Sequence, residues 1–138
     1  MPLAETILDF QLRGTSVKPI DLGGGQTRVE ITYEGQVTGD VPGQHFGTLT
    51  FIASGPPDRP VPWTWTGATL TTSGTIVRVS AQGHGIRTGD GHKARYRGTV
   101  CYATDDPRLA SFNNVIGAVE FETDPATQLA KGAVCVWK

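Results

Sequence analysis

Apolar and polar side chains alternate with a period of two along this chain, and no stretch keeps the period of an amphipathic helix. In the first run, Leu8, Phe10 and Leu12 share one face, while Ile7 falls on the opposite, charged face. Such alternation is typical of a half-buried strand. Similar runs recur along the whole chain and predict eight strands, at residues 5–13, 27–38, 47–53, 63–71, 75–82, 93–103, 115–123 and 130–137.

Glycine, proline, aspartate and asparagine separate these runs, as expected for tight turns. The Pro-rich stretch at 54–62 predicts a stiff connection. The segment 107–112 is the exception to the strand pattern. Pro107 follows two aspartates, and Asp105 or Asp106 is expected to cap one short helical turn that starts there.

Both ends of the chain are strand-like, and two unpaired strands would leave adhesive sheet edges. An antiparallel sheet of eight strands removes its edges by closing on itself. We therefore predict an all-β fold, a single domain over residues 1–138 that forms an eight-stranded antiparallel barrel. Ala133 to Trp137 should pair near the amino-terminal strand. Such a barrel offers one central cavity for a small ligand.

Charge and composition exclude several classes of partner. The formal net charge is −1 and the chain has no basic tract, so we expect no nucleic acid. No apolar run reaches the ~18 residues of a membrane-spanning helix, so we expect no membrane partner. Residues 1–10 lack the basic region of a signal peptide, which favours the cytoplasm. Cys101 and Cys135 are therefore expected to be reduced thiols.

Several kinds of catalytic site lack their usual motif. His45, His84 and His92 show no close ligand spacing, so neither a metal nor a cofactor is expected. His84 and His92 flank one loop; they are either ordinary loop residues or neighbours at a barrel mouth. No G-x-S-x-G motif supports a hydrolase.

The carboxylates leave two alternatives open. Glu30 and Glu34 share a face but are about 13 Å apart at ~3.3 Å per residue, too far for a pair acting on one glycosidic bond. Glu120 and Glu122 also share a face. These carboxylates either form a solvated outer surface, or Glu30 or Glu120 lines the lumen and acts as a general base.

The aromatic residues and one asparagine complete the candidate site. The aromatic side chains either fill the barrel core or line an apolar pocket, with these candidate ligand-binding residues: Tyr33, Trp63, Trp65, Tyr102 and Phe112. Asn113 follows the predicted helical turn. Its amide either donates to a ligand carbonyl inside the barrel or caps the turn by bonding backbone groups.

Three segments carry a resemblance to a known group: GGGQTRVEITYEGQVTGDVPGQHFGTL, TTSGTIVRVSAQGHGIR and YATDDPRLASFNNVIGAVEFE. They resemble small uncharacterised bacterial proteins of the allene oxide cyclase-like barrel superfamily, over about residues 5–137. The resemblance implies an eight-stranded antiparallel barrel whose relatives perform cofactor-free cyclisations or bind small apolar molecules. The catalytic residues of those relatives do not map onto this sequence.

The leading functional hypothesis is a cofactor-independent cyclase, isomerase or lyase that acts on a hydrophobic or oxygenated metabolite in the barrel cavity. Its candidate catalytic residues are Asn113, Glu30 and Glu120. One alternative is a non-catalytic ligand-binding barrel, and another is a structural or interaction module with a filled core. A homodimer or higher homo-oligomer is the expected assembly.

Overall fold

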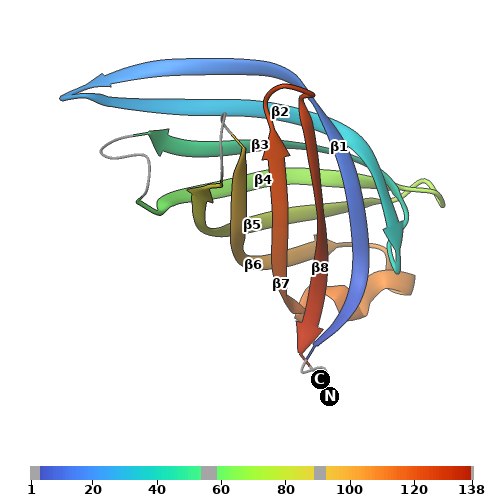
Figure 1. Ribbon diagram of the computed structural model, residues 1–138. Coiled ribbons are helices and arrows are strands. Elements are labelled where there is room, and N and C mark those ends of the chain that lie inside the picture. Colours follow the sequence, from blue (N-terminus) through green and yellow to red (C-terminus); the bar gives the residue numbers. More distant parts are fainter. Residues whose placement is uncertain (1–3, 54–58, 89–92, 138) are drawn as a thin grey trace.

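The computed structural model describes residues 4–53, 59–88 and 93–137, and within them the chain forms a closed antiparallel barrel in which each strand pairs with the next (Figure 1). This confirms the predicted fold class. Residues 54–58 of the expected Pro-rich connection, and His92, lie outside the described residues. The strands are β1 (Ala4–Gly23), β2 (Gln26–Gly39), β3 (Gly43–Ala53), β4 (Val61–Thr71), β5 (Ile76–Arg87), β6 (Ala94–Thr104), β7 (Ile116–Asp124) and β8 (Leu129–Trp137).

The barrel closes through its two terminal strands. β1 pairs antiparallel with β8, from Ala4 opposite Trp137 to Arg13 opposite Leu129. This confirms the predicted pairing, and it brings the two ends of the chain side by side at one end of the barrel (Figure 1).

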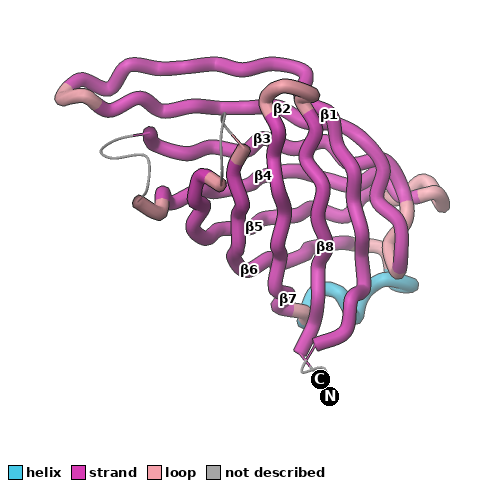
Figure 2. Tube along the Cα trace, in the orientation of Figure 1, coloured by secondary structure: helices cyan, strands magenta, loops and turns pink. Residues whose placement is uncertain are grey.

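β1 is longer than predicted, because it continues from residue 13 to Gly23. Beyond Arg13, β1 no longer pairs with β8 and pairs only with β2. There β1 and β2 form a hairpin that projects past the barrel (Figure 2). This segment is an edge strand, and an edge strand tolerates Pro19, which lacks a backbone N–H. A further prediction at this strand was wrong. Ile7 does not point to the charged face, because a bulge lies between Thr6 and Leu8, and both Ile7 and Leu8 are buried.

A short 3-10 helix, η1 (Pro107–Asn114), lies at the end of the barrel that also holds the chain termini (Figure 1). Asp106 caps it as predicted, because its carboxylate accepts a hydrogen bond from the backbone N–H of Arg108 at 2.9 Å. Phe112 is buried and meets the ring of Tyr102 edge-on at 5.6 Å. Helix η1 therefore covers this end of the barrel at the side of β6, and we call it the closed end.

No helix among the described residues is long and apolar enough to cross a membrane. Cys101 is exposed and Cys135 half-buried, and the structure holds both as free thiols.

Candidate functional site

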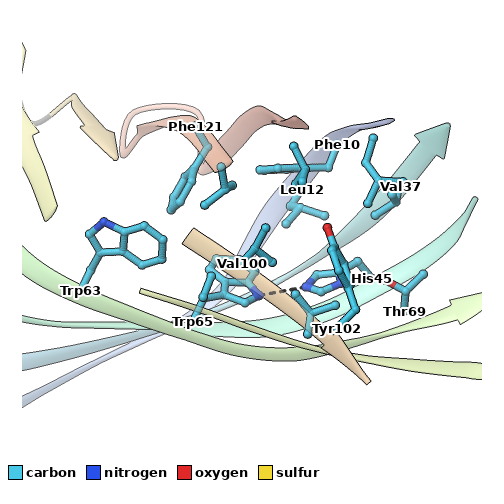
Figure 3. Close-up of a pocket in the computed structure, with 15 residues that line it drawn as sticks. Phe10, Leu12, Val37, His45, Trp63, Trp65, Thr69, Val100, Tyr102 and Phe121 are labelled. Atoms are coloured by element: carbon cyan, nitrogen blue, oxygen red, sulfur yellow. Dashed lines mark hydrogen bonds between the residues drawn. The ribbon is translucent and has the colours of Figure 1, made fainter. Parts of the chain in front are cut away.

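The barrel interior holds a small apolar cavity, which we call the inner cavity (Figure 3). Its volume is about 60 Å³, and Trp63, Trp65 and Tyr102 are among the residues that line it. A water molecule needs roughly 10–15 Å³ on this measure, whereas whole ligands occupy pockets of roughly 300–1,000 Å³. The inner cavity can therefore hold only a few atoms of a ligand.

His45 on β3 is a buried ionisable group in the wall of this cavity. Trp65 Nε1 donates to His45 Nε2 at 2.9 Å, and His45 Nδ1 lies 3.0 Å from Thr69 Oγ1 (Figure 3). Because Nε2 is an acceptor, the hydrogen-bond network assigns the single proton of the neutral ring to Nδ1. Burial lowers the pKa of His45 to about 4, so the imidazole is neutral at pH 7.

A larger chamber lies at the opposite end of the barrel from η1, and we call it the mouth chamber. Its volume is about 640 Å³, and residues from the β1–β2 hairpin and the neighbouring strand ends line it, among them Val17, Ile31 and Phe51. Tyr33 and Tyr96 also line it, at the side that faces the barrel interior.

A continuous set of ring contacts separates the two spaces. The Tyr33 ring stacks on Trp65 at 5.6 Å, and Tyr96 stacks on Phe121 at 4.7 Å. Trp63 meets Tyr96 edge-on at 6.0 Å and Phe121 edge-on at 5.3 Å. We call these five residues the aromatic layer; Tyr33 and Tyr96 form the floor of the mouth chamber, and Trp63, Trp65 and Phe121 line the inner cavity on the other side.

The mouth chamber carries a few polar groups. Burial raises the pKa values of Tyr33 and Tyr96, so both hydroxyls keep their protons at pH 7 and can donate hydrogen bonds. The Tyr96 hydroxyl is hydrogen-bonded to Thr123. Arg59 and Arg87 line the same chamber. No group of three or more metal-ligating side chains occurs in the described part of the chain.

The structure places four of the five predicted ligand-binding aromatics at these two spaces. Trp63, Trp65 and Tyr102 line the inner cavity, and Tyr33 lines the mouth chamber. Phe112 lines neither; it packs against Tyr102 from η1 at the closed end.

The two predicted catalytic carboxylates do not face the lumen. On β2, Ile31 and Tyr33 point inward, and Glu30 alternates with them to the outer face, where it lies 3.4 Å from Arg28 Nε. Glu120 on β7 is exposed and pairs with Arg97 at 3.4 Å, whereas Glu30 is half-buried. The alternative of a solvated outer surface therefore describes both residues, and neither can act as a base within the cavity.

Asn113 is exposed and lies on η1, outside the cavity. Its Oδ1 accepts from the backbone N–H of Thr104 at 2.8 Å, and its Nδ2 donates to the carbonyl of the same residue at 3.0 Å. This geometry matches the alternative in which the amide bonds backbone groups at the turn.

Sequence reasoning did not single out His45 or Tyr96 as site residues. The predicted strand at 47–53 left His45 out, whereas β3 starts at Gly43 and includes it. The earlier start carries the inward alternation of Leu49 and Gly47 back to His45. His84, in contrast, is exposed.

Comparison with solved structures shows the same barrel in other proteins, although neither a family model nor a curated protein matches this chain. A protein of unknown function from Clostridium acetobutylicum has a TM-score of 0.80 at 16% identity, over 98% of this chain and 99% of that one. A β-barrel-like protein from Acinetobacter baumannii has a TM-score of 0.78 at 12% identity, over 100% and 98% of the two chains. An enzyme from Penicillium herquei has a TM-score of 0.65 at 13% identity, over 96% and 92%.

At these identities the likeness establishes the fold and nothing about function. The neighbours include small bacterial β-barrel proteins, in line with part of the predicted resemblance. Membership of the allene oxide cyclase-like superfamily is not confirmed and stays a prediction.

Proposed function

We propose that this protein binds a small, mainly apolar molecule in the mouth chamber. The observation that carries the proposal is the chamber itself: it has a volume of about 640 Å³ and an aromatic floor formed by Tyr33 and Tyr96. Pockets for small ligands typically measure roughly 300–1,000 Å³ and are lined mainly by apolar and aromatic side chains.

A candidate partner for an oxygen atom lies at the inner cavity, beyond the floor of the mouth chamber. Trp63 is buried, and its Nε1 has no hydrogen-bond partner among the described residues. An unpaired buried N–H costs about 1–3 kcal/mol. Trp63 lines the inner cavity and not the mouth chamber, so only a ligand group that enters the inner cavity reaches this donor and recovers that free energy.

The proposal is tested with N-phenyl-1-naphthylamine, a neutral aromatic probe whose emission rises in apolar surroundings. Ala94 is half-buried and lines the mouth chamber, so Ala94→Phe places a ring in the ligand's space. The matched control is Ala110→Phe, which makes the same change at an exposed position of η1. We expect saturable binding to wild type and to Ala110→Phe, and an affinity at least tenfold lower for Ala94→Phe. Absence of saturable binding to wild type, or equal binding to both variants, overturns the proposal.

Catalysis is the second candidate function, as a cofactor-independent cyclase, isomerase or lyase acting on a hydrophobic or oxygenated metabolite. His45 favours it, because a neutral imidazole in an apolar wall is an ionisable group of the kind that moves protons. A barrel of the same fold occurs in an enzyme from Penicillium herquei. However, Trp65 occupies the lone pair of His45 Nε2, so catalysis requires this hydrogen bond to open.

A simple carbonyl compound separates the two candidates. We propose to measure deuterium exchange at the methyl groups of acetone, which has few enough atoms for the inner cavity, in D₂O by NMR, for wild type, His45→Gln and Trp65→Phe. If His45 acts as a base, exchange is faster with wild type than with His45→Gln. Exchange is faster still with Trp65→Phe, because this substitution removes the hydrogen bond to His45 Nε2. Equal rates for all three proteins refute the catalytic candidate and leave binding.

The cellular location and the assembly of the protein belong to this proposal. Two free thiols fit a reducing compartment, and we propose the cytoplasm. A homo-oligomer stays a prediction, which light scattering of the purified protein checks.

A further inference from the structure

Two arginines line the mouth chamber, and among the described residues they lack the carboxylate partners that four other arginines have. In the part of the chain that the structure describes, neither Arg59 nor Arg87 takes part in an ion pair or a side-chain hydrogen bond. Four other arginines lie within 3.4 Å of a carboxylate: Arg28, Arg95, Arg97 and Arg108.

The other charged residues known to line the chamber, in the part of the chain that the structure describes, do not cancel these two. Asp124 also lines the chamber, but Lys93 Nζ lies 4.0 Å from its Oδ2. Among the described residues, the rim of the mouth chamber therefore has a surplus of positive charge. Electrostatic potential in a cleft of one charge sign attracts ligands of the opposite sign.

The positive rim stands over an apolar floor. Arg87 ends β5 and pairs with Ala94 of β6, while Tyr33 and Tyr96 form the floor. A guanidinium group presents planar, paired N–H donors that match a carboxylate or a sulfonate. Tyr33 keeps its proton at pH 7 and can add one more donor.

We propose that the mouth chamber is selective for apolar anions. The apolar body of the ligand lies on Tyr33 and Tyr96, and its carboxylate or sulfonate group binds Arg87 and Arg59 at the rim. This inference rests on the proposed function and adds to it the charge of the ligand.

Two probes with the same aromatic body test the charge preference. 1-Anilinonaphthalene-8-sulfonate is anionic, and N-phenyl-1-naphthylamine is its neutral counterpart without the sulfonate. We expect wild type to bind the anionic probe at least tenfold more tightly at low salt. Added salt should reduce that advantage, because it screens exposed charges, and should leave the neutral probe unaffected.

Arginine variants show which residues cause the preference for the anionic probe. Arg87→Gln and Arg59→Gln should each lower the affinity for the anionic probe at least threefold, and the double variant should lower it at least tenfold. None of these variants should change the affinity for the neutral probe. The matched control is Arg78→Gln, because Arg78 lies on the same strand as Arg87, is exposed and does not line the chamber. Circular dichroism melts confirm that each variant is folded, since this sulfonate probe also binds partly unfolded chains.

The outcomes distinguish the two proposals. If both probes bind wild type equally and the mouth variants behave like Arg78→Gln, charge selectivity is refuted while ligand binding stands. If the anionic probe binds but Ala94→Phe does not weaken it, its site lies elsewhere and this inference is again wrong. If neither probe binds, the proposed function fails as well.

Discussion

Replacing Asn113 by alanine should destabilise the barrel without touching its ligand chamber. The pairing of β6 with β7 ends at Cys101 opposite Ile116, so the last residues of β6 have no strand on that side. The Asn113 amide takes the place of a strand residue there, because it bonds both the N–H and the carbonyl of Thr104. A net contribution of about 1 kcal/mol for each hydrogen bond gives a loss of about 2 kcal/mol.

The neighbouring residue provides the control for this variant. Asn114 is also exposed on η1 and makes no side-chain hydrogen bond to the described residues, so Asn114→Ala should change the free energy of unfolding by less than ~0.5 kcal/mol. Urea unfolding measures both variants, and probe titration of the folded proteins should give wild-type affinity. The reasoning is refuted if the two variants are equally stable, or if Asn113→Ala melts normally but binds the probe at least tenfold more weakly.

Three further predictions concern pH, packing and redox state. The folded-state pKa of His45 is about 4, below the usual value of about 6.5 for an unfolded chain, so its contribution to stability is present above pH 6.5 and is lost as the pH falls. Urea unfolding should show a loss of about 3 kcal/mol by pH 4, a component that His45→Gln lacks. In Gly47→Ala the new Cβ meets the Trp65 indole, and the displaced ring should cost about 1–3 kcal/mol and shift tryptophan emission; unchanged emission contradicts this. Thiol titration of denatured, unreduced protein should find both Cys101 and Cys135 free; finding none overturns the reduced state and the cytoplasmic proposal.

The barrel could be predicted because strand alternation and turn residues are local signals, and closure follows from the need to pair two terminal strands. The length of β1 could not. Residues 14–23 hold Gly14, Pro19 and Gly23, which are unfavourable inside a sheet, and only the edge position past Arg13 makes them acceptable. The bulge at Ile7 likewise depends on the partner strand rather than on β1 alone.

The aromatic residues that line the candidate site could be predicted from the sequence, but its polar groups could not. Trp63 and Trp65 stand out in sequence as closely spaced aromatics on one face. His45 did not, because its environment depends on Trp65 and Thr69, which β4 brings beside it. The direction of Glu30 depended on which face of its strand meets the core, and alternation alone does not decide that.

A crystal structure of the protein with N-phenyl-1-naphthylamine tests the central claim most directly. The account predicts the probe inside the mouth chamber, with its rings against Tyr33 and Tyr96. An empty chamber in crystals grown with saturating probe, or a probe bound only on the outer face of the barrel, contradicts it.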